Sequence, residues 1–203
     1  CIRDSGKTTL MNMLSGIYYP DEGQIFVDGK EVEIRSPKDA FDLHIGMIHQ
    51  HFKLVDLFTA TENIILGLEG KLDIAEASKK VKEICDKYGF DIDPNQKIYD
   101  MSVSQKQTVE IVKVLYRGAD ILILDEPTNH LDIPSREALE AALLDFGGTM
   151  LVVSHDRYFI NKLSTRVLSI GMGGAESFDG GYDDYAARIA EQSAEKPKTA
   201  KTV

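Results

Sequence analysis

The sequence predicts an α/β fold built around a mostly parallel sheet. Residues 121–124 are four apolar residues that run directly into the carboxylates of Asp125 and Glu126. A buried parallel strand has this pattern, and it delivers polar groups to the sheet edge where α/β folds bind ligands. Near the start of the chain, Gly6-Lys7-Thr8 opens an apolar helix, whose backbone N–H groups are suited to a phosphate. Both observations indicate a core that binds a phosphate-bearing ligand.

The chain matches the second half of a P-loop at Ser5-Gly6-Lys7-Thr8-Thr9. In such a loop the lysine reaches the β and γ phosphates of a nucleotide, and the hydroxyl that follows it ligates Mg²⁺. The first glycine of the full motif would stand at position 1, which is cysteine here. The alternative is an ordinary helix start, but the acidic strand farther along favours the nucleotide interpretation. The expected fold is therefore a P-loop NTPase core.

Hydrophobic periodicity and turn residues predict the remaining elements. Asp28-Gly29 is a strong hairpin signal and predicts a small antiparallel part. Residues 51–117 carry helical periodicity and few strand signals, so we expect an inserted helical subdomain. The expected helices are 8–15, a short helix from Ser36, 74–88, 105–117 and 135–144. The expected strands are 24–27, 31–34, 45–48, 121–124, 150–153, 166–170 and 175–178.

Composition narrows the classes of protein that the chain can belong to. It has 203 residues, 43% of them hydrophobic, which is ordinary for a soluble globular domain. No apolar run approaches the roughly 20 residues that a membrane-spanning helix needs. The net charge is −10 and the isoelectric point is about 5.0. Because nucleic-acid binding depends on clustered Lys and Arg, we expect no direct DNA binding.

Three further motifs resemble those of the ATP-binding cassette (ABC) ATPases. Residues 101–107, Met-Ser-Val-Ser-Gln-Lys-Gln, resemble the family's Leu-Ser-Gly-Gly-Gln signature, with Val103 and Ser104 in place of the glycines. His155, after the apolar residues 150–153, resembles the switch histidine, and Gln50 resembles the Q-loop glutamine. The order and spacing of these motifs are specific to the family, and the resemblance covers nearly the whole chain. It implies an ATPase that uses ATP and Mg²⁺.

The resemblance implies a role for each of these residues. Glu126 is the expected general base, with His155 and Gln50 close to the γ-phosphate and the attacking water. The expected Mg²⁺ ligands are Thr8, Gln50 and Asp125.

The signature also implies a head-to-tail dimer, because in the family this surface closes over the ATP held by a second cassette. The residues expected at that contact are Ser102, Val103, Ser104 and Gln105. Asp132 matches the D-loop aspartate, which links the two sites in the family. Together with residues 5–9, these are the expected nucleotide-binding residues.

The two parts of the chain resemble different branches of the family. Residues 1–128 resemble the ATP-binding subunits of importers for simple sugars or nucleosides. Residues 129–190 resemble ABC-F proteins, which are soluble and ribosome-associated. The segments that carry these likenesses are 14–20, 45–52 and 102–105 in the first part and 129–135, 154–160 and 180–185 in the second. The chain therefore has the pattern of a chimera, of natural, engineered or assembly-error origin.

We expect the ATPase to power import of a sugar or nucleoside through a membrane permease, because the partner-facing helical subdomain belongs to the importer-like part. Such a subunit works in the cytoplasm, at the inner face of the cell membrane, with a second cassette as its partner. One alternative is an ABC-F-type translation or antibiotic-resistance factor with the ribosome as partner. The other is an inactive fragment.

The expected organisation is one ABC ATPase domain over residues 1–190. Its core lobe comprises residues 1–50 and 118–180, and the helical subdomain comprises residues 51–117. Because the chain begins at the phosphate loop, we expect its N-terminal strands to be missing and the chain to be unstable. Residues 191–203 are rich in Ala, Lys, Thr and Glu, and we expect a disordered tail.

Overall fold

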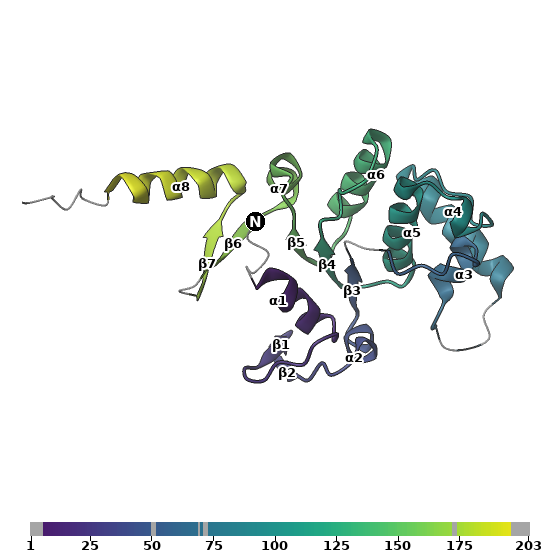
Figure 1. Cartoon of the computed structure of the whole chain (residues 1–203), viewed down its shortest axis with the longest axis horizontal. Coiled ribbons are helices and arrows are strands. Elements are labelled where there is room, and N and C mark those ends of the chain that lie inside the picture. The colour runs from purple at the N-terminus through teal and green to yellow at the C-terminus, as the bar shows by residue number, and fades with distance from the viewer. Residues whose placement is uncertain (1–5, 50–51, 69, 71–72, 172–173, 196–203) are drawn as a thin grey trace, which may run out of the picture. The chain divides into compact units, whose positions relative to one another are not determined.

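The computed structural model describes residues 6–49, 52–68, 70, 73–171 and 174–195. Their contacts group into two compact units, one running from Gly6 to His155 and the other from Asp156 onward. The units are described separately below (Figure 1). The single domain expected over residues 1–190 stays a prediction.

A three-stranded parallel sheet forms the centre of the first unit. Strands β3 (Ile45–Ile48), β4 (Ile121–Asp125) and β5 (Thr149–Val153) pair in the order β3-β4-β5. Ile45 is paired with Ile121, and Ile121 with Thr149. Since all three strands are parallel, their carboxyl ends meet at one edge of the sheet. The parallel sheet predicted from the apolar runs is confirmed.

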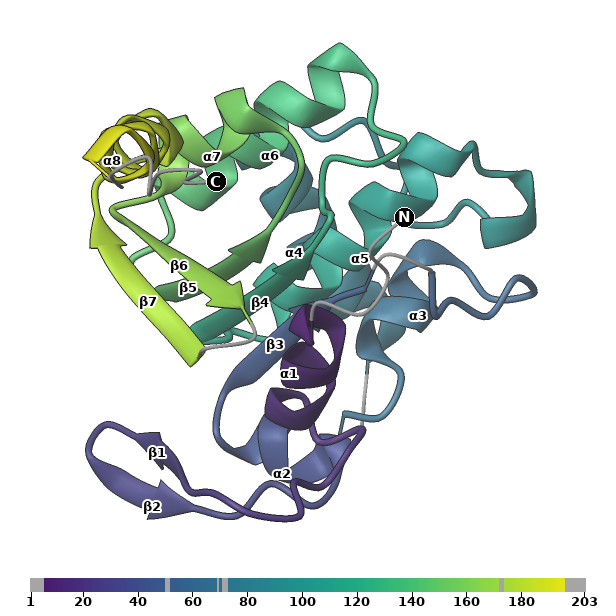
Figure 2. The ribbon, with the colours of Figure 1, turned by 60° about the vertical axis from the view of Figure 1, so that its left-hand side comes forward.

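Helices cover both faces of this sheet. Met11 of α1 (Lys7–Leu14) packs with Ile45 and Ile123, which lie on one face because side chains alternate along a strand. The opposite face carries Gly46, where an added Cβ would lie 2.5 Å from Val114 of α5 (Val103–Tyr116). Figure 2 shows α1 in front of the sheet and α5 behind it. The sheet is therefore enclosed between layers of helices.

The predicted antiparallel part is also present. Strands β1 (Ile25–Val27) and β2 (Lys30–Val32) pair with each other. Asp28 and Gly29 connect them with φ values of 51° and 75°, as a two-residue hairpin turn requires. The following helix α2 (Pro37–Asp42) begins where Ser36 accepts a hydrogen bond from the Asp39 N–H.

The helical part contains α3 (Ala60–Ile65), α4 (Ile74–Tyr88), a 3₁₀ turn at Ile98–Asp100 and α5. Side-chain caps set the starts of the helices. Thr59 and Glu62 form a reciprocal capping box at α3, and Asp73 accepts hydrogen bonds from the first turn of α4. The helical character predicted for this segment is confirmed, although the short α3 was not foreseen as a separate helix.

Helix α6 (Ile133–Leu144) connects β4 to β5. The second unit contains α7 (Arg157–Leu163), the hairpin of β6 (Arg166–Gly171) and β7 (Gly174–Asp179), and α8 (Tyr182–Glu195). The predicted hairpin is confirmed.

Helix α8 continues to Glu195, so it includes the first residues of the segment that was expected to form the tail. The physical reason lies in Ala and Glu, which are strong helix formers and extend a helix whose first turn is acidic. Residues 196–203 lie outside the described part. Within the described part, no helix has the length and apolar character that crossing a membrane requires.

Candidate functional site

The first turn of α1 is open to an outside partner. Gly6 precedes it with φ of 70°, a left-handed conformation that glycine adopts at little cost, and it provides no side-chain cap. No side chain among the described residues is seen to cap this turn, so its N–H groups suit a ligand. Thr8 and Thr9 are exposed and Lys7 is half-buried. A helix start with these groups is suited to a phosphate, as the sequence predicted.

The two carboxylates lie at the carboxyl end of β4. Asp125 is the last residue of the strand and is paired with Val153 of β5. The Glu126 N–H then donates to the Val153 carbonyl at 2.8 Å, which fixes Glu126 beside the end of β5. Glu126 has φ of 50°, which is uncommon for a residue with a side chain.

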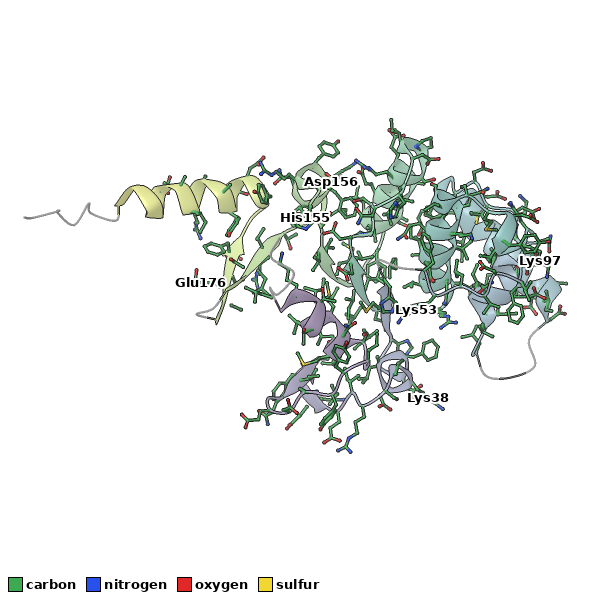
Figure 3. The ribbon with its side chains drawn as sticks, in the orientation of Figure 1. Lys38, Lys53, Lys97, His155, Asp156 and Glu176 are labelled. Atoms are coloured by element: carbon green, nitrogen blue, oxygen red, sulfur yellow. The ribbon has the colours of Figure 1, made fainter. Side chains whose placement is uncertain are left out.

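Glu126 and His155 meet at this edge of the sheet. Figure 3 labels His155, which follows β5. The His155 N–H donates to Glu126 Oε2 at 3.3 Å, and His155 Nε2 lies 3.5 Å from Oε1. The Glu126 side chain is 10% exposed, whereas that of His155 is 88% exposed. Glu126 Oε1 is buried without a hydrogen-bond partner among the described residues. Such an acceptor favours the approach of a water or another donor.

The signature segment forms the start of α5. Ser102 is the N-cap and makes a capping box with Gln105, which explains why α5 begins at Val103 rather than at the predicted Gln105. The Val103 side chain is exposed at this helix start. Ser104 turns toward the segment before α6: its hydroxyl donates to Ser135 Oγ at 3.2 Å and accepts from the Asp132 N–H at 3.4 Å.

Asp132 serves as the N-cap of α6. Its carboxylate accepts a hydrogen bond from the Ser135 N–H at 3.0 Å. Hydrogen bonding from Ser135 to the charged form holds the pKa of the Asp132 carboxyl below its ordinary value. The loop that the sequence identified as a D-loop is therefore joined to the signature turn within one chain.

The structure brings together two groups of predicted residues, Glu126 with His155, and Ser104 with Asp132. Ser5 and Gln50 lie outside the described residues, so their predicted roles stay predictions, as do the chemical roles of the others. Ser135 was missed, although Asp132 with a proline in the following turn is a sequence signal for a helix start. Gln107 was named in the signature segment without a role. It is buried, and its amide nitrogen lies 3.5 Å from the Pro127 carbonyl oxygen.

The residues present fit a Mg-nucleotide. Thr8 and Asp125 offer one hydroxyl and one carboxylate, and among the described residues no cluster of His, Cys, Asp and Glu is large enough to hold a metal ion alone. Mg²⁺ is ordinarily bound in this way, by one or two protein ligands together with phosphate oxygens and water. Glu126 Oε1, which accepts no hydrogen bond from the described residues, adds a proton acceptor next to such a site.

A cavity of about 560 Å³ lies between α2, β3 and α5. Its polar lining includes His49, Lys53, Glu110 and Lys113, and Phe41 supplies an aromatic wall. Glu110 accepts a hydrogen bond from the Lys53 N–H at 2.8 Å and lies 3.6 Å from Lys113 Nζ. Burial is the main cause that lowers the His49 pKa to about 4, and the positive charges of Lys53 and Lys113 add to it.

Comparison with known proteins gives importer subunits as relatives. The nucleoside import ATP-binding protein NupA of Lactococcus lactis subsp. cremoris is 46% identical over 176 residues, which are 83% of this chain and 35% of NupA. The guanosine import ATP-binding protein NupO of Bacillus subtilis is 56% identical over 128 residues, which are 61% of this chain and 25% of NupO. The chain thus spans about a third or less of the length of these relatives.

Solved structures agree with the fold. An ATP-binding cassette bound to ADP and phosphate, solved as a dimer in a post-hydrolysis state, is 25% identical and matches with a TM-score of 0.72. The match covers 86% of this chain and 81% of that one. A nucleotide-free cassette from an ABC transporter matches with a TM-score of 0.76 at 18% identity, over 96% of this chain and 83% of that one, which shows the fold alone. The model of the ABC transporter family matches residues 4–129. The chain belongs to the ABC transporter family.

Proposed function

We propose that the chain binds and hydrolyses ATP with Mg²⁺ and thereby powers import of a nucleoside or sugar through a membrane permease. The observation that carries the catalytic part is the Glu126 carboxylate. It is largely buried, it follows Asp125 at the end of β4, and one of its oxygens lacks a hydrogen-bond partner among the described residues. A carboxylate held in this way can accept a proton from a water.

Other residues of the chain prepare the site for this proton transfer. Lys7 and the first turn of α1 bind phosphate oxygens, and Thr8 and Asp125 hold Mg²⁺, which neutralises phosphate charge when it is bound. Glu126 receives the proton of the attacking water on Oε1. The His155 backbone N–H fixes Oε2, and the exposed imidazole lies where it can orient the water or contact the γ-phosphate.

The catalytic proposal is tested by Glu126→Gln. The amide keeps the shape and the acceptor for the His155 N–H but cannot take a proton. We expect ATP turnover to fall by roughly a hundredfold or more, with ATP affinity nearly unchanged. Lys7→Ala is the contrasting variant, since it should weaken ATP binding itself. Wild-type turnover in Glu126→Gln would show that the assigned base is wrong.

The proposed partners are a second cassette and a permease. The exposed start of α5 fits the family's contact with a second cassette, and the named relatives are nucleoside importers. We place permease docking at the cavity beside α2 and the segment that begins at Phe52, at the inner face of the cell membrane. The likeness of residues 129–190 to ABC-F proteins stays a prediction, and the comparisons give no support to a ribosomal partner.

Docking is tested by placing a charge on the wall of the cavity. Phe41 lines the cavity and is 39% exposed, so Phe41→Glu should abolish co-purification with a co-expressed nucleoside or sugar permease that the wild-type protein binds. Its ATP turnover should stay close to wild type. Phe26→Glu is the matched control, because Phe26 is 57% exposed on the β1–β2 hairpin. Co-sedimentation with ribosomes in the absence of permease binding would contradict the import proposal.

A further inference from the structure

Ser104 makes its side-chain hydrogen bonds within its own chain rather than toward solvent. Its hydroxyl donates to Ser135 Oγ at 3.2 Å and accepts from the Asp132 N–H at 3.4 Å. A hydroxyl has one proton to donate, and here that proton is used within the chain. The residue at the second glycine position of the signature therefore binds the loop that leads into α6.

Gln107 makes a second connection one turn farther along α5. It is 1% exposed, and its amide nitrogen lies 3.5 Å from the Pro127 carbonyl oxygen. Ser104 and Gln107 lie on the same face of the helix because they are three residues apart. The N-terminal part of α5 is thus connected at two points to the segment between β4 and α6.

This segment begins next to Glu126, which carries the reactive carboxylate. The Asn129 N–H donates to the Glu126 carbonyl at 3.1 Å, and the Leu131 N–H donates to the Thr128 carbonyl at 3.3 Å. These local bonds make a compact turn between Glu126 and Asp132. A displacement of the signature turn would therefore reach Glu126 through a short, hydrogen-bonded segment.

We propose that Ser135 is a positioning residue, which holds the Ser104 hydroxyl and so joins the signature turn to the D-loop as one piece. Closure of a second cassette on the signature surface would then align Glu126 in the same chain. The inference rests on the proposed function and deepens it. It also connects the two parts of the sequence that resemble different branches, since Ser104 lies before position 128 and Ser135 after it.

Ser135 allows a clean test because its backbone and its hydroxyl make different bonds. The Ser135 N–H donates to the Asp132 carboxylate, which caps α6, and alanine would keep that bond. Ser135→Ala therefore leaves the backbone bond intact and removes the acceptor of the Ser104 hydroxyl, together with the hydrogen bond of the Ser135 hydroxyl to the Asp132 carboxylate. Ser135→Thr keeps a hydroxyl, and Ser78→Ala on α4 is the matched control for a half-buried helical serine.

The experiment measures ATP turnover, KM for ATP and thermal unfolding for these variants. A net hydrogen bond of ordinary strength corresponds to a fall in kcat of about three-fold to ten-fold for Ser135→Ala. KM should change by less than about two-fold, because the substitution leaves the phosphate loop intact. Ser135→Thr should restore kcat, and Ser104→Ala/Ser135→Ala should be no slower than the slower of its two single variants.

Each other outcome overturns the inference. Unchanged kcat in Ser135→Ala, or a loss that tracks a lower melting temperature and that Ser135→Thr does not restore, would mean that the bond is only structural. A wild-type protein that binds no ATP and hydrolyses none would overturn the proposed function, and this inference with it. Normal wild-type turnover together with unchanged Ser135→Ala would overturn this inference alone.

Discussion

Glu126 is held in a backbone conformation that few carboxylates adopt. Its φ of 50° lies in the left-handed region, where a residue with a side chain costs on the order of 1–3 kcal/mol. The Val153 carbonyl accepts its N–H, and the His155 N–H donates to its carboxylate, so bonds on both sides maintain the conformation. The chain accepts this cost at the residue whose orientation the proposed chemistry requires.

The clearest pH dependence at the residue scale is expected from His49. Its ordinary pKa is 6.5, and burial lowers it to about 4 in the folded chain. Between these values the unfolded chain binds a proton that the folded chain does not, so stability falls as pH falls from about 6.5 toward 4. Replacing the imidazole by an amide should make stability depend less steeply on pH in this range.

We expect the free energy of unfolding, measured with denaturant, to fall less between pH 7 and pH 4.5 for His49→Asn than for the wild type. At pH 8 His49 is neutral in both states, so any difference there reports packing alone and serves as the control. Parallel stability curves for the two proteins across this pH range would refute the assignment to His49.

Single residues show what could be predicted from the sequence and what could not. The residues of the candidate site were recognised because their types and order follow a motif. The contact of Ser104 with Ser135 was not, because it depends on how α5 packs against the loop before α6. Likewise, nothing in the pair Asp125-Glu126 indicates which of them turns into the left-handed region.

At the scale of elements, the close packing of α5 on the sheet depends on Gly46. A Cβ at this position would lie 2.5 Å from Val114 Cγ1 and 3.0 Å from the Ala119 Cβ. Val114 belongs to α5 and Ala119 to the short segment between α5 and β4, so relieving these contacts would disturb one of the two. We expect Gly46→Ala to destabilise the protein by about 1–3 kcal/mol, measured by denaturant unfolding.

Gly147→Ala is the control for this substitution. An added Cβ at Gly147 would meet no atom within 4 Å, and neither glycine has a positive φ. Its expected effect is therefore within about 0.5 kcal/mol of zero. Equal stability of the two variants would contradict the packing account.

Element boundaries follow caps more closely than they follow hydrophobic periodicity. The apolar pattern placed the start of the signature helix at Gln105, whereas the Ser102 capping box begins it at Val103. The compositional bias after Glu191 suggested disorder, yet alanine and glutamate carry α8 to Glu195. Local hydrogen-bonding chemistry explains the first difference and helix propensity the second.

At the scale of the whole molecule, the sequence predicted the sheet well. One apolar run ends at two acids and another ends shortly before a histidine, and these runs predicted β4 and β5. The two strands pair in parallel. The separation of the contacts into two units could not be predicted, since it depends on which strands pair. β6 and β7 pair with each other, and among the described strands neither joins the β3-β4-β5 sheet.

We propose that the chain forms half of a composite ATP site. The signature surface at the start of α5 should close over nucleotide held by a second cassette, and loss of the base should trap that state. Light scattering of Glu126→Gln with and without Mg-ATP tests this most directly, and Lys7→Ala/Glu126→Gln is the control that should stay monomeric. We predict a doubled mass for Glu126→Gln in Mg-ATP only. An unchanged monomer with ATP demonstrably bound would contradict the claim.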